Sequence, residues 1–339
     1  MRVAVVGCGF MGQKHANAYK RMAGVELVAV CGWQENNREF IEETFGTAYF
    51  TSFDEMLTIT RPQVVSICLP TYLHKQYTIR AAQAGAHVIC EKPIATSLSD
   101  AEEMIEACAT YGVQLYIAHV LRFFPSYQNI VNQINGGEVG QLGMVSTRRV
   151  VEHPGGKEQS WYNDDAKSGG VIVDLMIHDT DFVRSLLGEV ESVYAMRKVS
   201  VDQQYGVVTY KFVNGTMANL EALWGFPGPL TAACRVAGKE GVIRYNSETS
   251  SSVRVHKTAL DQTIPYEKYE LSPLLKDVYQ EQLEHFMECI QLQKQPIITV
   301  DDALEALRLS LAANHSALLG KPIVMSDFYN EISKGGRGE

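Results

Sequence analysis

Residues Val3–Gly12 read VAVVGCGFMG and are the starting point for the architecture of this chain. Four apolar residues run directly into a glycine-rich turn, which predicts a buried strand, a tight turn and the first turn of a helix. Gly7 would make the turn, Gly9 would let a pyrophosphate approach the backbone, and Gly12 would let the helix pack on the strand. Free N–H groups at the helix N-terminus favour anions. We therefore expect a dinucleotide site lined by Gly7, Gly9, Phe10, Met11 and Gly12.

Strand and helix patterns alternate over the first third of the chain. Apolar strands alternating with helices are typical of a parallel, doubly wound sheet. We therefore predict a Rossmann domain over residues 1–121. Strands are expected at Val3–Val6, Glu26–Cys31, Val64–Leu69, His87–Cys90 and Gln114–Ala118, and helices near Phe10–Met22, Glu35–Phe45, Leu73–Ala84 and Ser99–Tyr111.

The pattern changes near residue 122, where strands begin to dominate. Asn214-Gly215 lies between two strand patterns and favours a hairpin with a type I′ turn. We predict an α+β domain over residues 122–330 with an open, mostly antiparallel sheet, followed by a disordered tail at 331–339. Strands are expected at Met144–Val151, Val190–Val199, Tyr210–Val213, Thr216–Leu220, Ala232–Ala237, Gly241–Tyr245 and Ser252–Lys257, and closing helices near Leu274–Gln291 and Asp301–Leu319.

Composition excludes several classes of protein. The 339 residues carry a net charge of −9 without a dense lysine or arginine run, which argues against nucleic-acid binding. No apolar stretch is long enough to span a membrane, and we expect no signal peptide. The seven cysteines are scattered without a C-x-x-C pair, so we expect reduced, apolar side chains in a cytoplasmic protein.

Two polar clusters follow predicted strands. Leu69 leads into PTYLH (Pro70–His74), and the strand ending at Cys90 leads into Glu91-Lys92-Pro93. Ligands of open α/β sheets bind at the carboxyl ends of the strands, where the glycine turn also lies. Lys92 there can hydrogen-bond a substrate hydroxyl; the alternative is a surface lysine in a loop before a helix-starting proline.

A third cluster lies in the segment from Gly169 to Asp181. Helical spacing places Asp174, His178 and Asp181 on one face, where a histidine near an aspartate can act as a general base. A structural polar stripe is an alternative. A metal site is least favoured, because no second group of histidine or cysteine ligands accompanies the cluster.

Taken in order, GCGFMG, PTYLH, EKP and the Gly169–Asp181 segment resemble the Gfo/Idh/MocA oxidoreductase family over nearly the whole chain. The resemblance implies a Rossmann domain, a C-terminal domain with an open sheet, and NAD(P)-dependent oxidation or reduction of a sugar or cyclitol. It also implies that Lys92, Asp174 and His178 are catalytic, and that the protein is a homodimer or homotetramer associated through the open sheet.

The resemblance leads to an expected mechanism. His178 would take the proton of the substrate hydroxyl while Lys92 hydrogen-bonds the same oxygen and Asp174 orients His178 or a second hydroxyl. Leu69, Pro70 and Glu91 would line the cofactor, Thr71 and His74 would contact the nicotinamide ribose, and the peptide bond before Pro93 is expected to be cis.

The choice between NAD and NADP depends on residues after the second strand. NAD-specific sites carry an acid about 20 residues after the glycines, but this chain has Gly32 there. Arg38 could reach a 2′-phosphate, Trp33 could stack beside adenine, and Glu35 could instead bind the ribose. The sequence therefore favours NADP slightly over NAD.

Substrate contacts are expected from Arg122, after the last Rossmann strand, and from Trp161. A tryptophan that fills the seam between domains is the alternative for Trp161. Two alternative functions share this fold: a glycosidase that oxidises its substrate transiently with bound NAD, and a non-catalytic cofactor sensor. A sensor would not need Lys92, Asp174 and His178.

Overall fold

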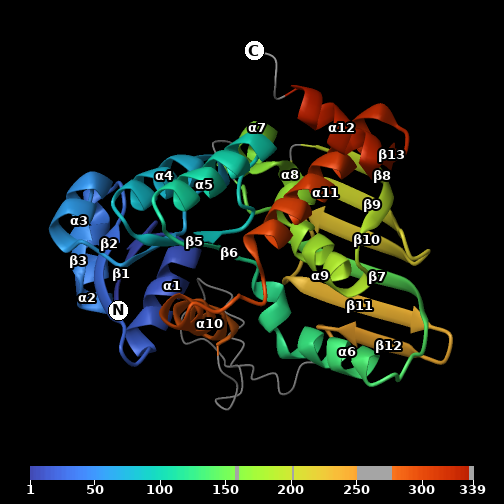
Figure 1. Ribbon diagram of the computed structural model, residues 1–339, viewed down its shortest axis with the longest axis horizontal. Helices are drawn as coiled ribbons and strands as arrows, with labels where there is room; N and C mark the ends of the chain where they lie inside the picture. The colour runs from blue at the N-terminus through green and yellow to red at the C-terminus, as the bar shows by residue number, and fades with distance from the viewer. Residues whose placement is uncertain (157–159, 201, 250–276, 336–339) are drawn as a thin grey trace.

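The computed structural model describes residues 1–156, 160–200, 202–249 and 277–335. Two sheets lie side by side, each packed against helices, and the long helix α11 (Val300–Leu319) lies between them (Figure 1). The fold therefore has the two parts that the sequence predicts.

The first sheet has six parallel strands in the order β3-β2-β1-β4-β5-β6. Its strands are apolar on both faces, as in β1, where Val3 to Val6 are all buried. The predicted doubly wound sheet is confirmed, although the prediction missed the three-residue strand β3. The strands are β1 (Arg2–Val6), β2 (Glu26–Cys31), β3 (Ala48–Phe50), β4 (Val64–Ile67), β5 (His87–Glu91) and β6 (Leu115–Ala118).

Helices cover both faces of this sheet. One face packs against α1 (Phe10–Arg21), α2 (Arg38–Phe45) and α10 (Val278–Leu292). The other packs against α3 (Phe53–Thr60), α4 (His74–Gln83), α5 (Leu98–Thr110) and the first half of α11. The sequence prediction placed the C-terminal helices in the second domain, whereas α10 lies under the first sheet (Figure 1), where Phe286 stacks on Tyr116 with ring centroids 5.0 Å apart.

Among the described residues, the second sheet has seven strands in the order β12-β11-β7-β10-β9-β8-β13. All neighbouring pairs are antiparallel except β7 and β10, so the predicted open, mostly antiparallel sheet is confirmed. The strand predicted at Ser252–Lys257 lies outside the described residues. The strands are β7 (Leu142–Val151), β8 (Val190–Val199), β9 (Gln204–Phe212), β10 (Met217–Trp224), β11 (Thr231–Gly238), β12 (Val242–Asn246) and β13 (Ile323–Val324).

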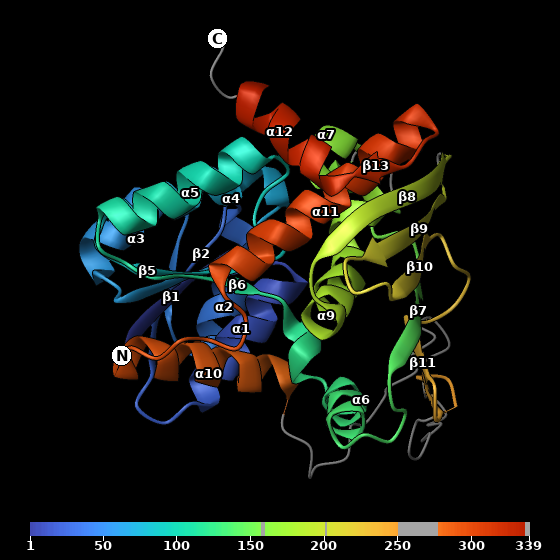
Figure 2. The same cartoon turned by 45° about the vertical axis from the view of Figure 1, so that its right-hand side comes forward.

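In the described part of the chain, helices cover one face of the second sheet (Figure 2). They are α6 (Pro125–Asn135), α8 (Gly170–Asp174), α9 (Ile177–Leu187), α12 (Met325–Gly335) and the second half of α11; the short helix α7 (Asp165–Ser168) precedes α8. The opposite face exposes apolar side chains such as Met196 and Val207.

Two local predictions are wrong. A type I′ turn needs positive φ at both Asn214 and Gly215, but only Gly215 has one, at 84°. The loop has three residues, Val213–Gly215, and the Gly215 N–H donates to Phe212 O over 2.9 Å. The expected disordered tail is also partly wrong, because α12 continues to Gly335; residues 336–339 lie outside the described part of the chain.

All seven cysteines are free thiols, and five of them are buried, as expected for reduced apolar side chains. Within the described residues, no helix is both long enough and apolar enough to span a bilayer.

Candidate active site

The glycine loop has the geometry that a dinucleotide needs. Gly7 has φ of 110°, and a Cβ there would lie 2.1 Å from Cys68 O. A Cβ at Gly12 would lie 1.8 Å from Gly7 O, so the loop and α1 touch at van der Waals distance. At Gly9, in contrast, a Cβ would meet nothing within 4 Å, so space opens above the loop. No side chain caps α1 and its first turn carries no acid, which leaves its N–H groups free for phosphate oxygens.

The PTYLH and EKP clusters meet at the same edge, because β4 and β5 are neighbours beside β1. His74 links the two loops. Its Nδ1 lies 2.9 Å from Pro93 O and its Nε2 lies 2.9 Å from Leu69 O, and burial lowers its pKa. Since its ring is fully buried between these carbonyls, His74 positions the loops, which corrects the expectation that it contacts a ribose. Thr71 is also buried, and the peptide bond before Pro93 is cis, as predicted.

Lys92 points from the end of β5 toward the second domain. Its Nζ donates to Asp174 O over 2.8 Å and to Asp174 Oδ1 over 3.1 Å. Both side chains are mostly buried. An ammonium has three donors, so two hold Lys92 on Asp174 and the third is left for a ligand oxygen.

The polar face predicted on a single helix does not form. α8 ends at Asp174 and α9 begins at Ile177, so Leu175 and Met176 interrupt the helical run. Asp174 therefore turns to Lys92, and Asp181 pairs with Arg122. Asp174 and Asp181, which were predicted to share a face with His178, thus bind different partners. Asp174 makes no hydrogen bond with His178.

His178 lies in the first turn of α9, partly exposed. Burial, and then the nearby cations of Lys92 and Arg149, hold the pKa of His178 well below its ordinary value. The positive end of a helix dipole acts in the same direction. A neutral imidazole beside an ammonium can accept a proton from a hydroxyl group that the ammonium holds.

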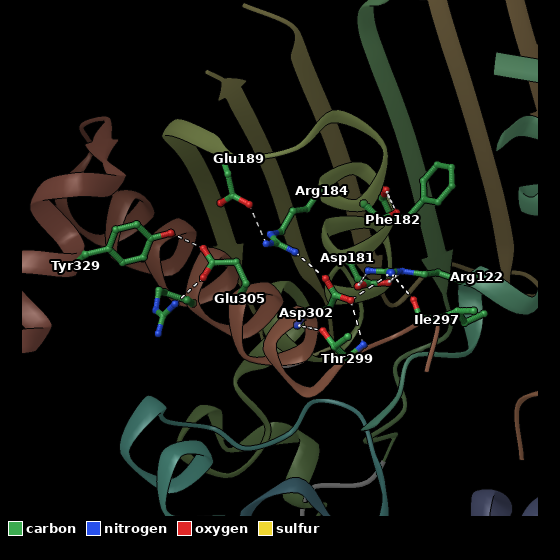
Figure 3. Close-up of polar contacts among 12 residues, drawn as sticks. Arg122, Asp181, Phe182, Arg184, Glu189, Ile297, Thr299, Asp302, Glu305 and Tyr329 are labelled. Carbon is green, nitrogen blue, oxygen red and sulfur yellow. Dashed lines mark hydrogen bonds and ion pairs between the residues drawn. The ribbon is translucent and has the colours of Figure 1, made fainter. Parts of the chain in front are cut away.

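Arg122 lies in an ion-pair network with Asp181 and Asp302 (Figure 3). It donates to both carboxylate oxygens of Asp181, and its Nη1 donates to Ile297 O over 2.9 Å. A further contact of 3.4 Å reaches Asp302 at the start of α11. All of its donor nitrogens are thus engaged in joining the two domains, which corrects the expectation that Arg122 binds substrate.

Residues around the expected adenosine end surround Gly32 closely. A Cβ at Gly32 would lie 2.5 Å from Cys8 Sγ and 2.7 Å from the Tyr49 hydroxyl, so a side chain there would require one of these two side chains to shift. Arg38 pairs with both Glu35 and Glu42 and donates to Tyr49 O over 2.9 Å. The exposed Trp33 donates to Tyr77 Oη over 3.3 Å.

Aromatic rings gather near Asp174. Trp161 stacks on Tyr162 with ring centroids 3.9 Å apart, and Tyr72 lies 6.4 Å from Trp161. Burial raises the pKa of Tyr162, and the charges of Asp174 and Glu91 raise it further. Trp161 itself is partly exposed, at the start of a short 3₁₀ turn.

Sequence reasoning missed two buried histidines. His15 Nε2 contacts Glu91 Oε1 at 3.1 Å and its Nδ1 contacts Ser66 Oγ at 2.6 Å, so the Glu91 carboxylate is held beneath the loop. His119 follows β6 directly and is fully buried. The sequence did contain a signal for His119, because it is a polar residue directly after a predicted strand of this sheet. In the part of the chain that the structure describes, no three His, Cys, Asp or Glu residues group as metal ligands.

Comparison with known proteins agrees with this geometry. The family model "Oxidoreductase family, NAD-binding Rossmann fold" matches residues 1–119, and "Oxidoreductase family, C-terminal alpha/beta domain" matches residues 131–325. The chain belongs to the Gfo/Idh/MocA oxidoreductase family. It is therefore an NAD-binding oxidoreductase with the fold that the sequence resemblance implies.

Relatives align over almost the whole chain. The scyllo-inositol 2-dehydrogenase (NAD(+)) of Bacillus subtilis is 29% identical, covering 95% of this chain and 96% of the relative. The myo-inositol 2-dehydrogenase of Thermotoga maritima is 26% identical, covering 93% and 96%. The crystal structure of GenD2 from gentamicin A biosynthesis in complex with NAD has a TM-score of 0.86 at 23% identity, covering 96% of each chain, which supports the fold.

Proposed function

We propose that this protein is a dehydrogenase that oxidises a secondary alcohol of a cyclitol or sugar, or reduces the matching ketone, with a nicotinamide cofactor. The observation that carries the proposal is the Lys92–Asp174 pair beside His178, at the strand edge where the glycine loop also lies. The names of the inositol dehydrogenases among its relatives support the substrate class.

The residues present fit a dinucleotide. Gly7, Gly9 and Gly12 with the N-terminus of α1 would hold the pyrophosphate, and the space above Gly9 leaves room for it. Phe10 and Met11 border this space, and Leu69, Pro70 and Thr71 follow the neighbouring strand. When bound, the nicotinamide supplies the hydride acceptor.

We favour NAD over NADP as that cofactor, against the slight preference that the sequence gives to NADP. Arg38 is the cation available for a 2′-phosphate, but Glu35 and Glu42 already neutralise it. A 2′-phosphate would meet these carboxylates, whereas ribose hydroxyls could donate to them. Gly32 is weak support for NADP, because the close packing of Cys8 and Tyr49 around it also favours a residue without a side chain.

Lys92 and His178 divide the chemistry between them. The remaining N–H of Lys92 would donate to the substrate oxygen and stabilise the negative charge that develops on it. His178, neutral because of its lowered pKa, would accept the hydroxyl proton. Asp174 acts through Lys92, since it accepts two hydrogen bonds from that ammonium. Trp161 and Tyr162 would offer an aromatic surface to the C–H face of a sugar or cyclitol ring.

The test is nicotinamide reduction, followed by absorbance with NAD⁺ and NADP⁺, over a panel of inositols, sugars and glycosides. We expect turnover with a cyclitol or sugar and a higher kcat/KM with NAD⁺. Lys92→Ala should lower kcat by at least about 100-fold while NADH binding stays intact. Full activity of Lys92→Ala would contradict the assignment, and cleavage of a glycoside without net reduction would identify the glycosidase instead.

We also propose that the protein is a homodimer or homotetramer that associates through the open face of the second sheet. Large apolar side chains on that face, among them Met196, Val207 and Met217, support the proposal.

A further inference from the structure

The proposed function leaves one requirement open. To accept a proton at Nε2, the His178 ring must carry its hydrogen at Nδ1, and the tautomer is set by the partner of that nitrogen. Nδ1 of His178 is buried and has no hydrogen-bond partner among the described residues, whereas Nε2 is not buried. Some group must orient this ring if His178 is the base.

The nearby carboxylates do not supply that partner. Asp174 accepts both of its contacts from Lys92. Asp179, the next residue after His178, accepts from Arg149 over 2.7 and 3.2 Å in a fully buried ion pair. The nearby groups that act on the pKa of His178 are Lys92, Arg149 and His119, and none of them is an acid. Lysine and arginine only donate, so His119 is the one of these that can accept.

His119 is placed for this role by the topology. Ala118 pairs with Glu91 across β6 and β5, so His119 and Lys92 leave neighbouring strand ends side by side. The 3₁₀ turn that His119 begins (Val120–Phe123) packs against α9, which carries His178. His119 thus follows β6, the last strand of the first domain, and Lys92 follows the neighbouring strand β5. His178 lies in the first turn of α9, which faces these strand ends.

The ring of His119 is 0% exposed, and neither of its nitrogens has a partner in the described part of the chain. A buried polar group without a partner is destabilising and rare in folded proteins, so such a residue calls for a physical explanation. Together with Nδ1 of His178, three buried nitrogens lack partners in this region. The two nitrogens of one imidazole point in different directions, so one buried water can bind a nitrogen of His119 and Nδ1 of His178, and two to four polar partners hold such a water.

We propose that His119 is a positioning residue for His178. A ring nitrogen of His119 accepts, through one bridging water, the hydrogen bond of His178 Nδ1–H, and this holds the His178 tautomer whose Nε2 is free to accept the substrate proton. His119 itself touches neither substrate nor cofactor. The inference rests on the proposed role of His178, and adds the group that orients it.

The surroundings keep His119 able to accept. Burial is the main cause that lowers its pKa, and the charges of Arg122 and Lys92 lower it further against those of Asp181 and Glu91. Asp181 is held on both oxygens by Arg122, and Glu91 is held by His15 and the Lys92 N–H. The ring is therefore neutral near pH 7, with one nitrogen available as an acceptor.

The first experiment reads the tautomer directly. Protein labelled with ¹⁵N-histidine is examined by NMR, with His178 assigned from the signals lost in His178→Gln. We expect the wild type to show His178 as the Nδ1–H tautomer, and His119→Phe to lose or mix that tautomer. If His178 keeps the same tautomer in His119→Phe, the proposal is wrong. Because no substrate is needed, this result stands even if the proposed reaction fails.

The second experiment reads the kinetic consequence. His119→Phe should lower kcat by about 10- to 100-fold, within the range of a general base, with KM changed less than threefold and NADH affinity unchanged. His119→Gln keeps an acceptor and should recover part of kcat; it also serves if His119→Phe does not fold. His315→Phe is the matched control, since that ring lies on α11 and packs beside Phe328 of α12. Wild-type kcat in His119→Phe would overturn the proposal.

Discussion

Two glycines of the dinucleotide loop differ in what a side chain would meet. A Cβ at Gly12 would lie 1.8 Å from the Gly7 carbonyl oxygen, whereas at Gly9 it would meet only open space. We expect Gly12→Ala to destabilise the free protein by at least about 2 kcal/mol, because a backbone atom must move. Gly9→Ala should change stability by less than about 1 kcal/mol but weaken NADH binding at least about tenfold, because its methyl group occupies the phosphate approach.

Urea unfolding of the free protein and fluorescence titration with NADH measure the two effects separately. The two variants act as controls for each other, since each changes one glycine of the same loop to alanine. Wild-type NADH affinity in Gly9→Ala would show that the pyrophosphate does not approach the backbone there.

His178 should give the reaction an acid limb at low pH. Its pKa is lowered well below the ordinary value of about 6.5, chiefly by burial, so the neutral base persists as the pH falls. We expect kcat/KM for alcohol oxidation to decline only well below pH 6.5, when the imidazole takes up a proton. The pH profile at saturating cofactor checks this, and an acid limb centred at or above pH 6.5 would contradict it.

Motif chemistry singled out Lys92 and His178 as candidate catalytic residues, but it did not give the partners that the structure shows for Lys92. Spacing suggested that Asp174 would orient His178, whereas Asp174 binds Lys92. Arg122 and His74 have the residue types of ligand-binding groups, yet both are engaged within the protein. A partner far away in the sequence decides such roles, and local patterns carry no information about it.

At the scale of elements, α11 begins with a capping box that also joins the domains (Figure 3). Thr299 Oγ1 accepts from the Asp302 N–H, and Asp302 Oδ2 accepts from the Thr299 N–H over 3.0 Å. Asp302 also accepts from Arg184 over 2.8 Å. Asp302→Asn should therefore lower the free energy of unfolding by about 1–3 kcal/mol at pH 7.

The same carboxylate predicts a pH dependence. Burial raises the pKa of Asp302, but the Thr299 hydrogen bonds and the Arg122 and Arg184 charges outweigh it, so the net shift is downward. The unfolded chain, with a pKa of about 3.9, then takes up the proton first as the pH falls. The stabilisation is full above about pH 4 to 5 and is lost through the folded-state pKa below it.

Urea midpoints measured between pH 7 and pH 3 would test this slope. We expect the difference between wild type and Asp302→Asn to shrink as the pH falls. Asp301→Asn is the matched control, because Asp301 is exposed in the same helix turn and should show little effect. A constant difference across the range would mean that the Asp302 charge does not stabilise the fold.

Elements with strong periodicity were predictable. Strand β2 and strand β8 match their predicted bounds, Glu26–Cys31 and Val190–Val199. The three-residue β3 is too short to show a period, and the break between α8 and α9 is hidden because Leu175 and Met176 continue the helical pattern. That break turns Asp174 toward Lys92. Because the sequence prediction missed the break, it also gave Asp174 the wrong partner, His178.

At the scale of the whole molecule, the C-terminal helices tie the two parts together. α10 supplies Leu283, Phe286 and Met287 to the core of the first sheet, and α11 packs on both domains. Order along the sequence suggested a boundary at residue 122 with all later elements in the second domain. The amphipathic pattern of a helix indicates that one face packs against apolar residues, but not which residues these are. The packing of α10 against the first sheet could therefore not be predicted.

The open face of the second sheet carries the last prediction. Met196 and Val207 face each other across β8 and β9 and are 56% and 41% exposed, with Tyr194, Tyr205 and Met217 also exposed on these strands and on β10. Exposed apolar side chains gathered on one face of a sheet are typical of an interface, and a second copy would bury them. We expect light scattering to give twice or four times the protomer mass for the wild type, and the protomer mass for Met196→Lys/Val207→Lys. Val213→Lys is the control, since Val213 is 70% exposed but lies in the hairpin loop away from this face. A double variant that keeps the wild-type mass and a native thermal transition would place the interface elsewhere, because two buried ammonium groups cannot remain unpaired in an apolar contact.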